Sequence, residues 1–274
     1  MSRTRLADEP TPARGAREDP LFVRSIEKAF RVLSAFGAGR PTLSLGQIAE
    51  ATELDKSAAQ RFAHTLERLG YLRKDPDTRR FELTTRALDL GYHYTRASPI
   101  VDRAMPYLLD LSRTTEEAIS LSVLDGAEIV YLARFMSRHM VSSNVIVGTR
   151  LPVYCTAPGR AMLACLPQGE ARTLLATTVR KAHSPHTLWR LPELMANLNE
   201  VAARGYALAV EEIFPDDVSL GAAVTGAQGE PVGAVSISVS RLRIAPKAAE
   251  EQFAPLLCAA ARSMSFHVLP RAPG

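Results

Sequence analysis

The chain has 274 residues, of which 46% are hydrophobic and 23% are charged, and its formal net charge is +4 at pH 7. This length and hydrophobic share suit two domains with a buried core each, and they exclude a chain that is disordered throughout. The chain lacks a run of about eighteen apolar residues and the apolar centre of a signal peptide, so we expect a cytoplasmic protein without a membrane segment. Its three cysteines lack C-x-x-C spacing, so we expect neither a disulfide framework nor a thiolate zinc site.

Residues 1–20 mix charged side chains with prolines and carry almost no large apolar side chain. Such a segment buries too little surface to offset the entropy cost of ordering, so the sequence predicts a flexible tail.

Residues 44–83 predict a helix, a turn, a second helix and a hairpin. Ser44 and Gln47 have the spacing of a capping box, so a short helix should start there and run to about Thr52. After a turn at residues 53–56, a second helix is indicated by apolar residues at the helical spacing. This stripe consists of Ala59, Phe62, Ala63 and Leu66.

The outward face of this second helix is rich in hydrogen-bond donors: Lys56, Ser57, Gln60, Arg61, His64 and Arg68. Gln and Arg side chains match the edges of adenine and guanine in the major groove of DNA. We therefore expect Gln60, Arg61 and His64 to contact bases. Lys56 and Ser57, at the start of the helix, suit phosphate oxygens.

Gly70 ends the second helix, and residues 71–83 alternate around Asp75-Pro76-Asp77 as a β-hairpin does. Its cations are Arg73, Lys74, Arg79 and Arg80. A basic hairpin behind a helix-turn-helix is typical of the wing of a winged helix, and Arg79 and Arg80 are its candidate phosphate contacts. For any single cation the alternative is a solvated surface charge, but the succession of elements favours DNA binding.

Residues 85–98 predict a linker helix that carries Leu88, Leu90, Tyr92 and Tyr94. An exposed helix with such side chains needs a partner surface. Two explanations stay open: the helix contacts a second copy of the chain, or it packs back onto its own domain.

Residues 99–268 predict an α+β domain. A helical stripe at 101–111 is followed by a hairpin around Asp125-Gly126. Further strands are expected at 206–211, 218–224 and 232–240, and helices at 157–165, 169–176, 191–204 and 246–266.

The strand at 235–240 alternates apolar residues with serines, so one of its faces carries hydroxyl groups. Ser236 and Ser238 would need polar partners beside an apolar cavity, and a carboxylate or phenol ligand supplies them. The alternative is a wet surface. Thr156, Ala157 and Gly159 would offer a hydroxyl and backbone amides to an anion at a helix start, although Gly159 could equally serve only the turn.

Arg160, which follows them, has two open explanations: it pairs with an acidic ligand, or it lies on the surface.

An enzyme of the common types would need a nucleophile with a base, a metal set or a phosphate loop. The chain lacks G-x-S-x-G, a P-loop and H-E-x-x-H. His183 and His186, with Glu193, have a spacing common by chance, and Cys155 has no histidine placed to activate it. We expect no catalytic residue, metal or cofactor. The alternative function, a metabolite-binding or catalytic cytoplasmic protein without DNA affinity, leaves the winged helix unexplained.

Several motifs over residues 20–268 resemble, in the same order, those of the IclR (isocitrate lyase regulator) family of bacterial transcription factors. They lie at 24–33, 54–72, 148–161, 205–211 and 233–238. The resemblance implies a winged helix-turn-helix at 21–84, a linker helix at 85–98, a GAF-like effector-binding domain at 99–268, and tails at 1–20 and 269–274. It also implies a homodimer or homotetramer on a palindromic DNA operator, regulated by a small organic acid.

The family often presents an acidic residue and, about ten positions later, a small side chain to the effector. Val210 or Glu211 and Leu220 fall at those positions here, which predicts a less polar pocket. Residues 150–160 resemble the branch that controls protocatechuate, hydroxybenzoate and β-ketoadipate metabolism. The resemblance therefore implies an aromatic or dicarboxylic acid as effector.

Overall fold

The structure is a computed structural model that describes residues 19–139 and 145–265. The predicted tail at 269–274, and the predicted tail at 1–20 except for its last two residues, lie outside the described residues. The chain divides into two compact units, Met1–Tyr94 and Thr95–Gly274. Within the described part of the chain, none of the helices has both the length and the hydropathy to cross a bilayer.

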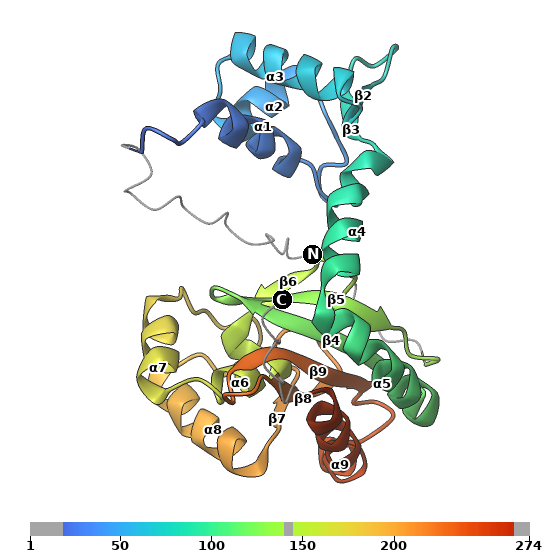
Figure 1. The fold of residues 1–274 in the computed structure, drawn as a ribbon, viewed down its shortest axis with the longest axis vertical. Helices are drawn as coiled ribbons and strands as arrows, with labels where there is room; N and C mark the ends of the chain where they lie inside the picture. Colours follow the sequence, from blue (N-terminus) through green and yellow to red (C-terminus); the bar gives the residue numbers. More distant parts are fainter. Residues whose placement is uncertain (1–18, 140–144, 266–274) are drawn as a thin grey trace, which may run out of the picture. The chain divides into compact units, whose positions relative to one another are not determined.

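The first unit contains the predicted helix-turn-helix and hairpin (Figure 1). Its elements are α1 (Arg24–Ser34), β1 (Thr42–Leu43), α2 (Leu45–Thr52), α3 (Lys56–Arg68), β2 (Leu72–Lys74) and β3 (Phe81–Leu83). The capping box is present, because the Gln47 backbone N–H donates to Ser44 Oγ and the Ser44 N–H donates to Gln47 Oε1. The predicted start and end of α2 are confirmed.

The core of this unit is built from all three helices and the hairpin, with Val32, Ile48, Ala59, Leu66 and Phe81 buried. Phe62 is only partly buried, and the stripe of α3 includes Ala58 instead. The two-residue strand β1, which is too short to give a periodic signal, pairs with β3 and makes a three-stranded sheet in the order β1-β3-β2.

A 3₁₀ turn (Thr85–Ala87) leads into α4 (Leu88–Ala97), the predicted linker helix. Leu88, Leu90, Tyr92 and Tyr94 each expose more than half of their surface in the single chain. This exposure excludes the explanation that these four side chains are buried against their own domain.

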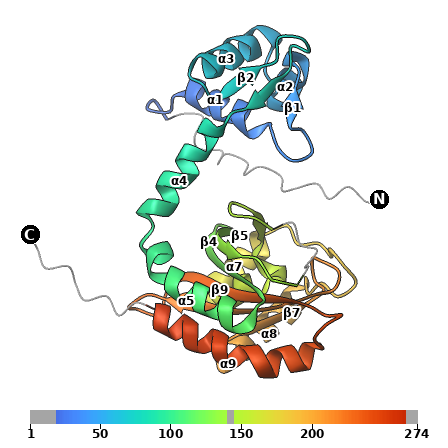
Figure 2. The same ribbon diagram turned by 90° about the vertical axis from the view of Figure 1, so that its right-hand side faces the viewer.

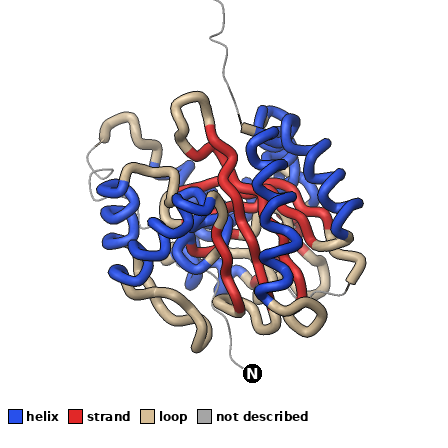
Figure 3. The backbone as a smooth tube through the Cα atoms, turned by 90° about the horizontal axis from the view of Figure 1, so that it is seen from below, coloured by secondary structure: helices blue, strands red, loops and turns tan. Residues whose placement is uncertain are grey.

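The second unit is an α+β domain around one antiparallel sheet, as predicted (Figure 3). The strand order is β6-β5-β4-β9-β8-β7. The strands are β4 (Ala118–Asp125), β5 (Glu128–Phe135), β6 (Arg150–Pro152), β7 (Ala207–Val210), β8 (Asp217–Thr225) and β9 (Pro231–Ser240). The helices are α5 (Pro99–Thr115), α6 (Ala157–Leu163), α7 (Gln168–Thr177), α8 (Leu191–Arg204) and α9 (Pro246–Met264), with a 3₁₀ turn at Val153–Cys155.

The two faces of this sheet differ in chemistry because different helices cover them. The apolar face, with Val235, Ile237 and Val239 of β9, packs against α5 and α9, which lie side by side (Figure 2). The opposite face carries small and hydroxyl side chains and is covered by α6, behind which α7 and α8 pack. The serine face of β9 therefore points towards α6.

Candidate DNA-binding surface and effector cavity

The outward face of α3 is exposed along its length. Asp55 caps the helix by accepting a hydrogen bond of 2.8 Å from the Ala58 N–H. All five residues predicted for DNA contact on this helix are exposed: Lys56, Ser57, Gln60, Arg61 and His64. The helix thus presents side-chain donors to solvent while its alanines and Leu66 fill the core.

The tip of the hairpin is organised by Asp75, whose carboxylate accepts hydrogen bonds from the backbone and hydroxyl of Thr78 and from the Asp77 N–H. These bonds hold the pKa of Asp75 below its usual value. Arg79 is exposed and has left-handed backbone (φ 58°) at this tip. The tip of the hairpin therefore presents the Arg79 side chain to solvent.

Arg80, also predicted to contact phosphate, has partners inside its own unit. Its guanidinium donates to Thr42 O (2.8 Å), Thr42 Oγ1 (2.9 Å) and Gln47 Oε1 (3.0 Å). Arg80 therefore ties the hairpin to β1 and α2, a role that the sequence did not indicate.

A small cavity of about 30 Å³ lies between the serine face of the sheet, α6 and the segment after β7. Three of the predicted effector residues line it: Thr156, Ala157 and Ser238. Ser236 lies on the same face of β9 and is buried, paired in register with Ser120 and Gly221. Ser236 is therefore covered by protein, and the alternative of a wet surface does not hold for it, whereas Ser238 and Ser240 are partly buried.

Besides Gly159 and Ser236, two further predicted effector residues, Leu220 and Glu211, do not line this cavity. Leu220 lies in the apolar core against α5 and α9, on the other face of the sheet. Glu211 has left-handed backbone (φ 51°), and its carboxylate pairs with Arg241 and accepts from the Asp216 N–H. Of these two neighbouring acids, it is the next residue, Glu212, that lines the cavity.

The start of α6 differs from the predicted anion site. A Cβ on Gly159 would lie 2.2 Å from Val153 O, so the glycine is required by the turn. Thr156 Oγ1 already accepts from the Gly159 N–H, and Pro158 has no N–H to offer. Little donor capacity is left in the first turn for an anion.

Arg160 fits neither of its two explanations. Only 1% of its surface is exposed, its Nη2 lies 2.6 Å from Glu212 Oε1, and the same nitrogen donates to Leu208 O. Burial raises the pKa of Glu212, and the Arg160 charge opposes this rise. The pair is a buried salt bridge that joins α6 to the segment after β7.

Two other charged groups that line the cavity, Arg134 of β5 and Asp217 of β8, were not predicted from the sequence. Arg134 Nη1 donates to Ser120 Oγ at 3.0 Å. Burial raises the pKa of Asp217 to about 7, with Arg134 acting in the opposite direction. Only one indication of this site is present in the sequence, namely that Arg134 is a single cation within the apolar strand segment IVYLARF.

Hydroxyl groups surround these charges. Ser219 and Ser238 line the cavity and are hydrogen-bonded to each other at 3.3 Å, and Tyr131 adds a phenol whose pKa burial raises above its usual value. One cation, one acid that titrates near neutrality and several hydroxyls suit an organic acid with polar substituents.

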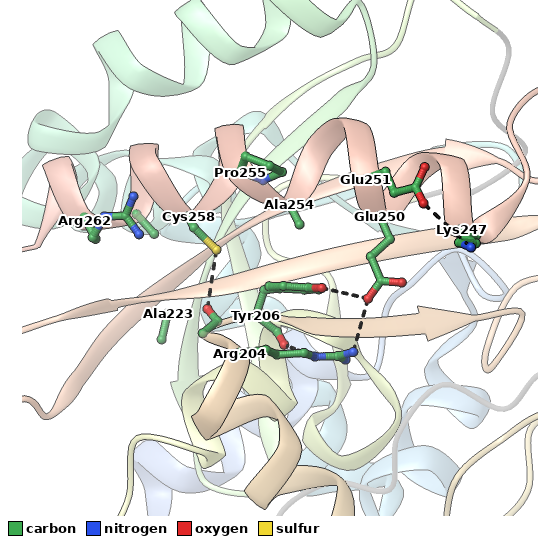
Figure 4. Close-up of a pocket in the computed structure, with 12 residues that line it drawn as sticks. Arg204, Tyr206, Ala223, Lys247, Glu250, Glu251, Ala254, Pro255, Cys258 and Arg262 are labelled. Atoms are coloured by element: carbon green, nitrogen blue, oxygen red, sulfur yellow. Dashed lines mark hydrogen bonds and ion pairs between the residues drawn. The ribbon is translucent and has the colours of Figure 1, made fainter.

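A larger, more open groove of about 650 Å³ runs along α9 beside the α8–β7 junction (Figure 4). Three of its polar groups are bonded to one another, because Glu250 accepts from Tyr206 Oη at 2.8 Å and pairs with Arg204. None of the predicted effector residues lines this groove. The small cavity is the better candidate for the effector.

His183 and His186 have different partners in the structure. His183 Nε2 lies 3.1 Å from Tyr154 Oη, whereas His186 Nε2 lies 3.8 Å from Glu211 Oε2. The two rings do not form a common site.

Each of the two units matches a known protein family. Residues 92–266 match the family described as "Bacterial transcriptional regulator IclR C-terminal", and residues 25–76 match the "IclR helix-turn-helix domain". The Pca regulon regulatory protein of Pseudomonas putida is 32% identical over 247 residues, which cover 90% of this chain and 84% of that protein.

Two solved structures share the fold. A transcriptional regulator from Rhodococcus sp. RHA1 is 33% identical with a TM-score of 0.80, covering 89% of this chain and 97% of that one. An IclR homologue from Microbacterium hydrocarbonoxydans, complexed with 4-hydroxybenzoate, is 23% identical with a TM-score of 0.74, covering 88% and 97%. The chain therefore belongs to the IclR family of bacterial transcriptional regulators, with a DNA-binding helix-turn-helix domain and an effector-binding C-terminal domain, and it is not an enzyme.

Proposed function

We propose that this regulator acts as a homo-oligomer on a palindromic operator, in the cytoplasm where bacterial DNA lies. The winged helix at 21–84 binds DNA, the helix at 85–98 links the domains, and residues 99–268 bind the effector. The main support for DNA binding is that α3, which follows the capped helix α2, exposes a face rich in hydrogen-bond donors. One such module contacts few bases, so selectivity requires two modules on paired half-sites.

The linker helix supplies a surface for this pairing. Leu88, Leu90, Tyr92 and Tyr94 expose apolar and aromatic area that a second copy can cover in a dimer or tetramer. Effector binding is then coupled to operator binding by about 1–3 kcal/mol, the usual range for such links.

The DNA contacts follow from the chemistry of each side chain. Gln60, Arg61 and His64 contact bases from the exposed face of α3. The phosphate contacts are Lys56, Ser57, Arg79 and Arg80, of which Arg80 also holds the wing on β1.

Replacing Arg61 with alanine is expected to lower the preference for the operator over unrelated DNA by about ten- to a hundredfold, because a bidentate base contact is worth about 1–3 kcal/mol. The measurement is a gel shift with DNA upstream of the protein's own gene against a scrambled fragment. Arg172→Ala, an exposed arginine on α7, is the matched control. Unchanged discrimination would remove Arg61 from the base contacts.

The effector is an aromatic acid whose carboxylate binds Arg134 and whose polar substituents contact the cavity hydroxyls. Two similarities support this class: the relative named for the Pca regulon, and the complex of a fold neighbour with 4-hydroxybenzoate. The cavity supplies the matching groups, namely Arg134, Thr156, Ser219 and Ser238. Because the space between them is small, side chains must move apart when such a ring enters.

Replacing Arg134 with glutamine is expected to weaken 4-hydroxybenzoate binding by about ten- to a hundredfold, because a hydrogen bond to a charged group is worth about 1.5–3 kcal/mol. Isothermal titration calorimetry on the full chain measures this loss. Arg134→Lys keeps the charge and should retain part of the affinity, and thermal unfolding checks that the fold survives. Equal affinities in Arg134→Gln and the parent chain would contradict the assignment.

A further inference from the structure

Arg134 and Asp217 lie on the same face of the sheet although two strands separate them. Arg134 is paired in register with Ser120, and Ser120 with Ser236 of β9. Asp217 is paired with Ser240 of β9, which shares the face of Ser236 because the two are an even number of residues apart. Both charged side chains line the effector cavity.

The other ionisable groups at this cavity are neutral or already paired. Burial raises the pKa of Cys155 to about 12 and that of Tyr131 above its usual value, so both stay protonated near neutral pH. Glu212 is paired with the buried Arg160 and also accepts from the Leu188 N–H. The charges that a ligand meets are therefore those of Arg134 and Asp217.

We propose that the effector is a monocarboxylate, and that its binding at Arg134 is accompanied by the uptake of one proton from solvent by the carboxylate of Asp217. This inference rests on the proposed function of the cavity as the effector site. It makes Asp217 the residue that selects the charge of the effector.

The physical basis is repulsion between like charges in a poorly solvated site. An effector carboxylate on Arg134 brings a second negative charge into the cavity that Asp217 also lines, which raises the affinity of Asp217 for a proton. Burial has already raised the pKa of Asp217 to about 7, so this proton is taken up readily near neutral pH. A dicarboxylate would bring a further negative charge. The other cation near the cavity, Arg160, forms a salt bridge with Glu212 and so does not balance this charge, and a dicarboxylate should therefore bind more weakly.

The sign of the pH dependence follows from this linkage. Below pH 7 Asp217 already carries its proton in the free protein, so affinity is independent of pH. Above pH 7 the proton must be taken up on binding, and affinity falls by up to about tenfold for each pH unit. With a free-state pKa of about 7, the expected loss between pH 6 and pH 8 is about tenfold.

The test is calorimetry on the full chain with 4-hydroxybenzoate and, as the dicarboxylate probe, adipate. Titrations at pH 7.5 in two buffers that differ in ionisation enthalpy give the number of protons taken up, and we expect about three-quarters of a proton for 4-hydroxybenzoate. Affinity should fall about tenfold from pH 6 to pH 8, and adipate should bind more weakly at both values.

Asp217→Asn, which is neutral at every pH, should bind 4-hydroxybenzoate without proton uptake and with a flat pH profile. Asp216→Asn is the matched control, because Asp216 is exposed, lies outside the cavity and has left-handed backbone (φ 59°) that asparagine tolerates. This control should keep the proton uptake and the pH dependence of the parent chain.

Three results would overturn the inference while leaving the cavity as the effector site: binding without proton uptake, a pH dependence that persists in Asp217→Asn, and tighter binding of adipate. Persistence in Asp217→Asn would point to Glu212 as the proton acceptor. If neither acid binds the parent chain at pH 6, the proposed effector class fails, and this inference fails with it.

Discussion

Replacing Glu212 with alanine is expected to lower the free energy of unfolding of the effector-binding domain by about 3–5 kcal/mol, because it leaves a buried charge without its partner. Arg160 is 1% exposed, and the Nε of its guanidinium has no hydrogen-bond partner among the described residues. The substitution also removes the acceptor of the Leu188 N–H. Chemical denaturation of the full chain, followed by circular dichroism, measures the loss.

Two further variants separate the charge from the packing. Glu212→Gln keeps an acceptor near Arg160 but not the negative charge, so its loss should be smaller. Replacing both partners, with Arg160→Met and Glu212→Leu, removes the unpaired charge and should recover much of the stability. A loss below about 1 kcal/mol for Glu212→Ala would place the pair among solvent-screened contacts, contrary to its burial.

The elements that the sequence predicted well are those with local signals. The capping box at Ser44 and Gln47 defines the start of α2, and the helix predicted at 191–204 agrees with α8, Leu191–Arg204, which ends at Gly205 in the left-handed region. These signals lie within a few residues of the boundary that they determine. The α+β class and the helix-turn-helix followed from the same kind of evidence.

The cavity could be predicted only in part, because it depends on pairing between distant strands. Arg134 and Asp217 are 83 positions apart in the sequence, and the register of four strands brings them onto one face. The left-handed backbone at Glu211 reverses the directions that the two neighbouring acidic side chains would otherwise take. Glu212 therefore lines the cavity, and Glu211 points away from it. Alternation along β8 places Leu220 on the opposite face from Ser219, in the apolar core and away from this cavity.

Replacing Gly221 with alanine is expected to lower the free energy of unfolding by about 3 kcal/mol, the upper end of the usual cost of overpacking. Gly221 lies on the cavity face of β8, where the first turn of α6 packs directly against the strand. A Cβ there would lie 2.4 Å from Pro158 N and 2.5 Å from Ala157 C. Both are backbone atoms, so a rotamer change cannot relieve the clash, and α6 itself must move.

The same displacement should weaken effector binding, because Thr156 and Ala157 at the start of α6 line the cavity. Denaturation and calorimetry with 4-hydroxybenzoate measure the two effects on one preparation. Gly169→Ala in α7 is the matched control, since a Cβ there meets nothing within 4 Å and alanine suits a helix better by about 0.5–1 kcal/mol. If Gly221→Ala unfolds and binds like the parent chain, the close approach of α6 to β8 does not shape the cavity.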